Sequence, residues 1–310
     1  MTEITGIHHV TAICGEAHEN LAFYTHVLGM RLVKKSVNQD DPSTYHLFYA
    51  DADGHPGTDL TFFPFRNSPP GRLGIGLGVE IALAIPAGTL AFWQARLIEH
   101  RAEVGEPETR RGDRALPVVD PHGQRLALVE TSATRVFTPW SDSSVPADKQ
   151  IVGLHAVRAW ERDLPLTATF LTNVLGFTDF GEEDGWHRFG VGDGGSGKHI
   201  EIRELPNVAR GMWGVGTMHH VAWRVADVET ELAVRERIAA AHRRPTEVID
   251  RFWFKSVYFL EPGGVLFELA TDGPGFAVDE DPAHLGEQLV LPPWLEAQRK
   301  EIEEALPALG

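Results

Sequence analysis

The sequence has a single cysteine and no long uncharged apolar run. Because Cys14 stands alone among 310 residues, the chain can form neither an intrachain disulfide nor a thiolate metal cluster. No uncharged apolar stretch reaches the about 18 residues that a transmembrane helix needs. The first residues also lack the basic and apolar regions of a signal peptide. We therefore expect a cytoplasmic protein.

Basic residues are scarce relative to acidic ones. The chain has 28 Lys and Arg against 44 Asp and Glu, a formal net charge of −16. This charge repels nucleic acid and anionic membrane surfaces, so we expect neither as a partner. A hydrophobic content of 43% is sufficient for a sizeable core in one or two domains.

A unit of one strand, one helix and three strands recurs four times. In the first unit the pattern predicts a strand over 4–13 and a helix over 16–30, followed by extended stretches at 31–37, 44–50 and 58–63. The pattern restarts at 77, 151 and 217. The helices of the first and third units both stop at Leu-Gly, which is typical of a glycine C-cap.

The repeat predicts an α+β fold in which four βαβββ modules pair into two open-barrel domains, because one module cannot cover both faces of its sheet. We expect an N-terminal pair over 1–145, a C-terminal pair over 146–275 and a helical tail over 276–310. The tail carries an amphipathic helix after two prolines. We expect it to pack on the fold or to associate copies in a homo-oligomer.

Paired histidines open the first and fourth modules, in "GIHHVTAI" and "TMHHVAWRV". When the opening strands are aligned, His9 matches Ile81 in the second module, Ala156 in the third and His220 in the fourth. A structural requirement of the repeat would place similar residues in all four modules. The second histidine of each pair therefore indicates site chemistry.

A glutamate breaks the apolar closing strand of the fourth module. Glu268 interrupts "VLFELA" and matches Ala127 in the second module. An isolated buried charge is very costly, so this carboxylate must be paired or must bind a cation. An ion pair with Arg224 or Arg251 is the structural alternative.

Taken together, His9, His220 and Glu268 form the ligand set of a mononuclear non-haem iron(II) site. Three protein ligands leave up to three positions of an octahedral ion open, as a catalytic site requires. Ligand type alone does not exclude manganese, zinc or nickel.

These features resemble the vicinal-oxygen-chelate superfamily of glyoxalases, bleomycin-resistance proteins and extradiol dioxygenases. Further resemblance lies in "TGIHHVTAICG", "YHLFYAD", "TFFPF", "GEPETR" and "PGGVLFE". The chain looks most like the dioxygenases that cleave the rings of hydroquinone and chlorohydroquinone. The resemblance implies Fe(II) bound by His9, His220 and Glu268. It also implies a substrate pocket lined by Tyr258, Arg251, Thr11, His8 and His219.

The residues themselves support these pocket assignments unequally. Thr11 shares a strand face with His9, because residues i and i+2 point the same way. Strict alternation turns His8 and His219 away from their ligand neighbours, so each is equally well explained as a hydrogen-bonded histidine behind the site. Tyr258 is equally well explained as a core aromatic on the strand beside the carboxylate ligand.

The expected activity is cleavage of a small aromatic diol with O₂, with Tyr258 or one of the paired histidines as acid or base. A glyoxalase-type zinc or nickel isomerase or lyase is the alternative, but such enzymes commonly use four protein ligands. The equivalent stretch of the first module, "TDLTFF", offers neither histidine nor glutamate, and only Asp59 lies near it. A metal-free binding protein, as some resistance members are, would have no such triad.

Overall fold

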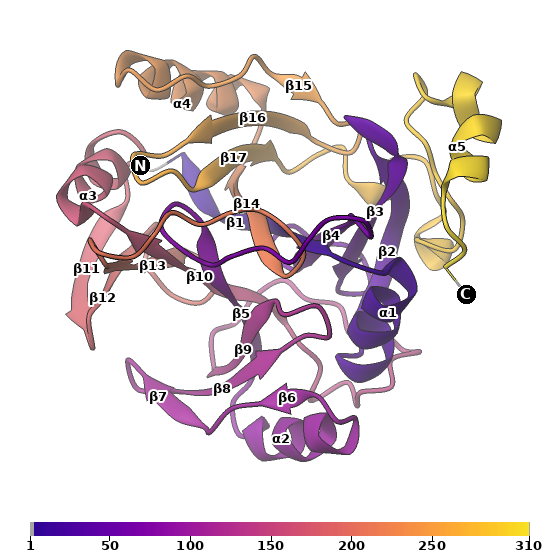
Figure 1. Cartoon of the computed structure of the whole chain (residues 1–310), viewed down its shortest axis with the longest axis horizontal. Coiled ribbons are helices and arrows are strands. Elements are labelled where there is room, and N and C mark those ends of the chain that lie inside the picture. The colour runs from indigo at the N-terminus through magenta and orange to yellow at the C-terminus, as the bar shows by residue number, and fades with distance from the viewer. Residues whose placement is uncertain (1–2, 310) are drawn as a thin grey trace.

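Two curled mixed β-sheets make up the computed structural model, which describes residues 3–309. The first sheet has eight strands in the order β15-β16-β17-β14-β1-β4-β3-β2, and the second has the path β11-β12-β13-β10-β5-β9-β8-β6, with β7 beside β8. The helices lie on the outside, with α4 and α2 at opposite ends of the molecule (Figure 1). We call the sheet face that points away from these helices the inner face.

The strands and helices follow the four predicted modules. The first module consists of β1 (Ile4–Cys14), α1 (Ala17–Ala22), a π-helical turn (Phe23–Val27), β2 (Arg31–Asn38), β3 (Asp41–Ala50) and β4 (Asp59–Pro64). The second consists of β5 (Gly78–Pro86), α2 (Leu90–Glu99), β6 (Glu103–Val104), β7 (Glu108–Arg110), β8 (Asp113–Val119) and β9 (Arg125–Thr131).

The second half of the chain repeats this plan. The third module consists of β10 (Gly153–Glu161), α3 (Leu164–Asn173), β11 (Thr178–Glu183), β12 (Trp186–Gly190) and β13 (His199–Glu204). The fourth consists of β14 (Thr217–Val225), α4 (Val228–Ala240), β15 (Ile249–Asp250), β16 (Lys255–Leu260) and β17 (Leu266–Thr271).

Modules pair across the chain. The antiparallel pair β1–β14 joins modules one and four in the first sheet, and β5–β10 joins modules two and three in the second. The expected halves 1–145 and 146–275 therefore each contribute one module to each sheet. The histidines of modules one and four already indicate that these two modules meet at one metal, but local periodicity does not show that they meet by pairing β1 with β14.

Each opening strand carries a one-residue bulge in its antiparallel pairing, as shown by its register shifts. The extra residues are His8, Val79, His155 and His219. The residue after each bulge points to the inner face, which makes Glu80 the equivalent of His9. The alignment of Ile81 with His9 was therefore wrong by one residue. The bulge, and not the glycine near the start of each strand, determines which residues point to the inner face.

The main apolar core lies between the sheets and the helices. Tyr24, Trp93, Phe170 and Ile238, one from each helical segment, are at most 5% exposed and pack into a continuous cluster with residues of both sheets. Gly29 and Gly176 have φ of +71° and +73°, so the expected left-handed caps after the first and third helices are confirmed.

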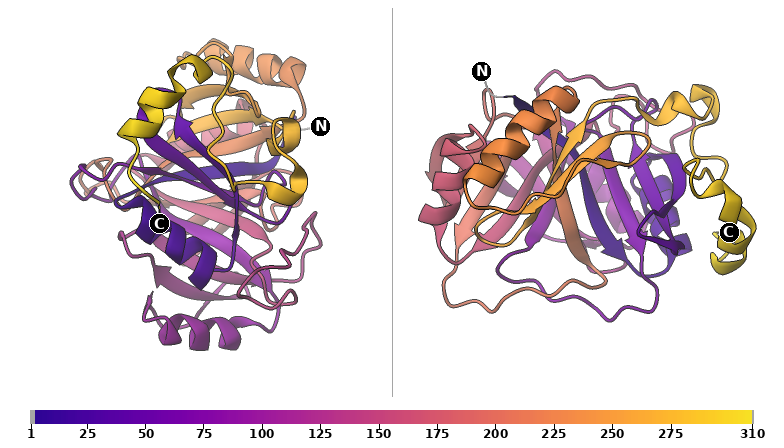
Figure 2. Two further views of the ribbon diagram at one scale, coloured as in Figure 1. Left: turned by 90° about the vertical axis from the view of Figure 1, so that its right-hand side faces the viewer. Right: turned by 90° about the horizontal axis from the view of Figure 1, so that it is seen from above.

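The C-terminal tail packs along the β2 edge of the first sheet (Figure 2), where its first part, with Phe276, contacts Phe48 and Trp253. Its last helix, α5 (Arg299–Ala305), buries Ile302 against Val37. Lys34 is fully buried and donates to Asp279 at 2.7 Å, and it also pairs with Glu280. The tail is therefore a packing element of this chain. Among residues 3–309, no helix is both long and apolar enough to span a bilayer.

Candidate metal centre

Three ligand-type side chains meet on the inner face of the first sheet. In the β1–β14 pair, His9 lies opposite Ala222 and Thr11 lies opposite His220, so the two histidines lie diagonally across the pair. The parallel strand β17 places Glu268 beside Ala222. Strands from modules one and four thus bring together residues more than 200 positions apart.

The ligand atoms converge at short distances. Oε2 of Glu268 lies 2.9 Å from Nε2 of His220 and 3.3 Å from Nε2 of His9. The two Nε2 atoms are 3.2 Å apart, and all three residues are at most 3% exposed. Oε1 of the carboxylate accepts a hydrogen bond from Ser256 at 2.5 Å, whereas Oε2 has no hydrogen-bond partner among the described residues.

A divalent cation fits this arrangement. A buried carboxylate oxygen without a donor faces two imidazole nitrogens, and such an oxygen is costly unless a cation binds it. Burial alone would raise the pKa of Glu268, but His9 and His220 outweigh it and hold that pKa well below its ordinary value. The carboxylate is therefore ionised at neutral pH, as a metal ligand must be.

A bulge histidine stands behind each candidate ligand. Nδ1 of His8 lies 3.0 Å from Nδ1 of His9, and Nδ1 of His219 lies 2.8 Å from Nδ1 of His220. Burial, followed by the neighbouring ligand histidine, lowers the pKa of His8 and of His219 to about 3, so both rings are neutral. Each can accept the Nδ1–H of the ligand beside it, which leaves the ligand's Nε2 free for a metal.

Threonine hydroxyls occupy the fourth side of the site. Oγ1 of Thr11 lies 3.0 Å from Nε2 of His220 and 2.7 Å from Oγ1 of Thr61. Thr61 lies opposite Thr11 in the parallel β1–β4 pair, the place that Glu268 takes in the β14–β17 pair. Nε2 of His46 contacts the Thr61 hydroxyl at 2.8 Å. The position of a fourth ligand therefore carries a hydroxyl group.

Tyr258 and Arg251 lie together beside the ligands. Tyr258 pairs with Glu268 across β16 and β17, and its ring lies edge-on to His220 with centroids 5.6 Å apart. The Arg251 guanidinium lies 5.3 Å from the Tyr258 ring centroid and donates to Asp40 at 3.0 Å. Burial, then the Glu268 charge, raises the pKa of Tyr258 well above its ordinary value, so this phenol stays protonated.

These residues open onto a cavity of about 40 Å³, which we call the first cup. It is lined by His9, Asn38, Gln39, Asp40, His46, Phe48, Phe63, His220, Arg251, Trp253, Phe254 and Tyr258. Of the residues expected to line the pocket, Thr11, His8 and His219 are not among them. His8 packs against Phe254 behind His9, and His219 stacks on Trp213 with centroids 4.9 Å apart. The first cup is thus an aromatic cavity lined by His9 and His220, and Glu268 contacts both histidines without lining it.

The ion-pair alternative for Glu268 is not seen. Arg224 pairs with Asp272 through two hydrogen bonds of 2.5 and 2.9 Å, and Arg251 pairs with Asp40. Within the described part of the chain, no arginine forms an ion pair with Glu268. The imidazoles of His9 and His220 are instead the groups that lie against this carboxylate.

The family model described as "Glyoxalase/Bleomycin resistance protein/Dioxygenase superfamily" matches residues 6–128 and 153–269. These segments cover the opening and closing strands of all four modules. The chain belongs to this superfamily. Its two curled sheets with few helices are the fold that the resemblance implied, and that expectation is confirmed.

Relatives within the superfamily include named dioxygenases. The chain is 41% identical to "Putative ring-cleaving dioxygenase MhqE" of Bacillus subtilis, with 98% of this chain and 99% of the relative covered. It is 31% identical to "Chlorohydroquinone/hydroquinone 1,2-dioxygenase" of Sphingobium indicum, with 96% and 95% covered. The expected likeness to ring-cleaving dioxygenases is therefore confirmed.

Solved structures agree on the fold. A crystal structure named as a putative dioxygenase from Bacillus subtilis superposes with a TM-score of 0.94 at 38% identity, covering 100% of this chain and 99% of that chain. Glyoxalase I from Zea mays superposes with a TM-score of 0.64 at 16% identity, covering 86% and 92%. The latter shows a shared fold only.

Several residues around the centre were missed or left open by the sequence. His46 lies on β3, beside β4, and Ser256 lies on β16, beside β17. The alternation of "TYHLFYA" could have placed His46 on the same face as Phe48. Asp59, whose register was open, lies opposite His9 in the parallel pair. Burial raises the pKa of Asp59 to about 7, and neither carboxylate oxygen has a partner within residues 3–309.

Proposed function

We propose that this protein is a metal-dependent ring-cleaving dioxygenase that opens an aromatic diol of the hydroquinone type with O₂. The observation that carries the proposal is the unpartnered Oε2 of Glu268, which faces two histidine Nε2 atoms at the end of an aromatic cavity. The substrate class is supported by the 31% identity to a chlorohydroquinone/hydroquinone 1,2-dioxygenase along nearly the whole chain.

Fe(II) is the metal that this ligand set favours. His9, His220 and Glu268 would hold it and leave up to three positions of an octahedral ion free. Bound Fe(II) would supply Lewis acidity and one-electron chemistry toward O₂. Manganese, zinc and nickel are compatible with the same three donors.

The protein's own groups orient the diol and handle its protons. Phe48, Phe63 and Phe254 offer rings against which an aromatic substrate packs while water is excluded. Arg251 is placed to hold the hydroxyl that lies away from the metal, and the protonated Tyr258 is placed to give or take a proton there. The Thr11 hydroxyl lies beside the metal position, 3.0 Å from Nε2 of His220, and is held there by the Thr61 hydroxyl.

In the proposed reaction the ring bond next to a hydroxyl-bearing carbon breaks and both atoms of O₂ enter the product. One of the two carbons becomes a carboxylate and the other an aldehyde, so the atoms balance without a further oxidant. A neutral aromatic diol is thereby converted into an open-chain anion.

The glyoxalase-type alternative is less well supported by the site. Enzymes of that type commonly use four protein ligands, and here Thr61 stands where a second glutamate would be needed. A metal-free binding protein would have no reason to keep a buried carboxylate oxygen without a partner.

Oxygen uptake tests the proposal. The protein is loaded with Fe(II) under anaerobic conditions, and O₂ consumption is then followed with hydroquinone and with catechol in parallel. We expect iron-dependent uptake of one O₂ per diol, faster with hydroquinone, and none in a His220→Ala variant. A protein that binds one iron per chain but consumes no O₂ with any diol would contradict the proposal.

A further inference from the structure

The second sheet forms a cavity at the place equivalent to the metal centre. We call it the second cup; its volume is about 440 Å³, against about 40 Å³ for the first cup. In the β5–β10 pair, Arg158 lies opposite Glu80, and in the parallel β10–β13 pair it lies opposite Glu201. By these registers Glu80, Ala156 and Glu201 take the places of His9, His220 and Glu268.

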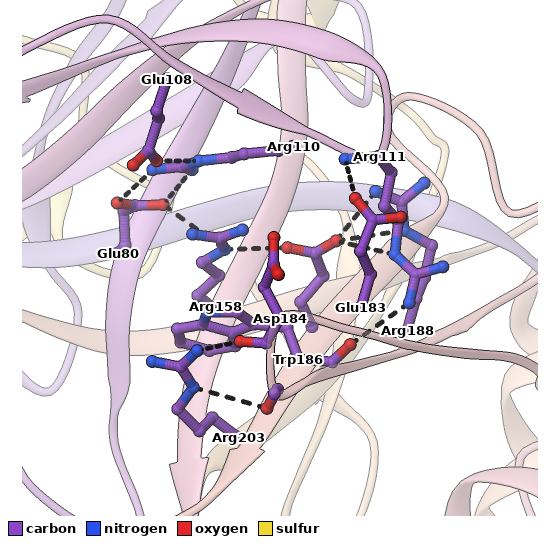
Figure 3. A network of polar contacts seen from close by, with 12 residues as sticks. Glu80, Glu108, Arg110, Arg111, Arg158, Glu183, Asp184, Trp186, Arg188 and Arg203 are labelled. Atoms are coloured by element: carbon purple, nitrogen blue, oxygen red, sulfur yellow. Dashed lines mark hydrogen bonds and ion pairs between the residues drawn. The ribbon is translucent and has the colours of Figure 1, made fainter.

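A guanidinium group takes the place of the cation there. Two of the three ligand positions carry carboxylates, and Arg158 lies between them (Figure 3). Its Nε donates to Glu201 at 2.8 Å and lies 3.8 Å from the Glu80 carboxylate. The third ligand position is an alanine, so the second cup lacks the ligand set of the first. The internal cation of this cup is therefore Arg158.

Further arginines hold the same two carboxylates. Arg110 makes a bidentate pair with Glu80 at 2.5 and 3.0 Å, and Arg188 donates to Glu201 at 2.8 Å. The cavity wall carries five arginines and five carboxylates, and next to it Arg188 interacts with both Glu201 and Asp113. In a chain with a net charge of −16, the charges of the second cup are thus balanced.

The arginine side chains are held in place, but some of their N–H groups have no acceptor. Neither Nη atom of Arg158 has a hydrogen-bond acceptor within residues 3–309, although the side chain is only 12% exposed. The Arg158 and Arg203 guanidinium groups lie 4.5 and 4.8 Å from the ring centroid of Trp186, which holds them in place. Nε of Arg111 has no hydrogen-bond acceptor within residues 3–309, but it lies 3.6 Å from the Glu201 carboxylate. The free Nη donors of Arg158 point to a ligand with acceptor oxygens.

We propose that the second cup binds a small organic carboxylate, with one carboxylate group on the free fork of Arg158. A planar guanidinium pairs with a planar carboxylate through two parallel hydrogen bonds. Because the arginines and carboxylates of the cup are balanced, a ligand with a single negative charge disturbs that balance least, whereas a phosphate dianion is repelled by Glu80 and Glu201. The volume of about 440 Å³ lies within the range of small-molecule sites.

Calorimetric titration of the metal-free protein tests this site. The probes are acetate, benzoate, cis,cis-muconate and inorganic phosphate, each at constant ionic strength. We expect one benzoate or one muconate to bind per chain. Arg158→Lys should lower the affinity for both about tenfold, since one charged hydrogen bond is lost. Glu80→Gln should raise the affinity for both, because it removes a competing carboxylate.

Two controls keep the outcome decisive. Arg72→Gln removes an arginine outside the second cup and should leave binding unchanged; His220→Ala, in the first cup, should also leave it unchanged. Thermal unfolding of each variant shows that it is folded. No binding to the wild type and to Glu80→Gln overturns the proposal, as does phosphate binding equal to that of benzoate. Because neither metal nor diol is present, the result does not depend on whether the ring-cleavage proposal holds.

Discussion

The Nδ1 atom of His219 lies 2.8 Å from the Nδ1 atom of His220. The same contact recurs at 3.0 Å between His8 and His9, and in both pairs the first histidine is the bulge residue of its strand. The third module also has a bulge histidine, His155, but Ala156 follows it. The bulge histidine is therefore present in three of the four modules. Only in modules one and four does a candidate metal ligand follow it, whereas His155 packs edge-on to His199 with centroids 5.1 Å apart.

Removal of the His219 ring should weaken metal binding. We expect His219→Ala to lower the affinity for Fe(II) or Zn²⁺ by about tenfold or more, because the Nδ1–H of His220 loses its acceptor. Competition against a chromogenic chelator measures this affinity without turnover. His155→Ala is the matched control and should bind metal as the wild type does. Equal losses in both variants would indicate a general effect on folding.

The Tyr258 hydroxyl should matter for turnover and not for metal binding. We expect Tyr258→Phe to keep its metal and to lower kcat by about a hundredfold, since a positioned proton donor contributes on this scale. Tyr45→Phe is the control, because the Tyr45 hydroxyl donates to the Pro307 carbonyl, away from the first cup. Steady-state O₂ uptake measures kcat, and metal analysis measures the bound metal. A wild-type kcat in Tyr258→Phe would show that the Tyr258 hydroxyl has no part in the mechanism.

The buried Lys34 should be a main anchor of the tail. Its ammonium group contacts Asp279 and Glu280, and Asp279 also accepts from the indole of Trp253 in the first cup. Lys34→Met leaves two carboxylates without their cation, and we expect a loss of about 3 kcal/mol in the free energy of unfolding. Urea denaturation measures it. Lys35→Met, which removes only a hydrogen bond to the Glu287 carbonyl, should cost less than about 1.5 kcal/mol.

A pair of buried carboxyl groups predicts a pH-dependent stability. Burial, then the charge of Glu261, raises the pKa of Glu161 from 4.5 to about 9. The folded state therefore holds a proton that the unfolded chain releases, so stability falls as the pH rises from about 4.5 to 9. Between pH 6 and 9 we expect the free energy of unfolding of Glu161→Gln to fall by about 2 kcal/mol less than that of the wild type. Glu301→Gln, at an exposed helical position, should show the same pH dependence as the wild type.

The sequence predicted the modules, the ligand set and the meeting of modules one and four, but not which strands pair. The repeat placed His9 and His220 at one position of the opening strand and Glu268 on a closing strand, because it provides its own comparison. Pairing of β1 with β14 depends on contacts across about 200 residues, which local patterns do not encode. The bulges shifted Glu80 into the place assigned to Ile81, since a slip of one residue turns a side chain to the opposite face.

Side-chain contacts between strands could also not be predicted from the sequence. His46 reaches the centre through Thr61, and Arg251 through its contact with Tyr258, so neither role follows from spacing along one strand. The charged second cup became visible only when the sheet registers were known. Its arginines come from β7, β9, β10, β12 and β13 and from the turn after β7.

Location of the bound metal tests the central claim most directly. Crystals of protein loaded with Fe(II) under anaerobic conditions, measured above and below the iron absorption edge, show where iron lies and how much is bound. We predict one iron per chain, bonded to Nε2 of His9, Nε2 of His220 and the Glu268 carboxylate, and none in the second cup. Iron bound elsewhere in the chain, or absent from this site at saturating Fe(II), would contradict the assignment of these three residues as the metal ligands.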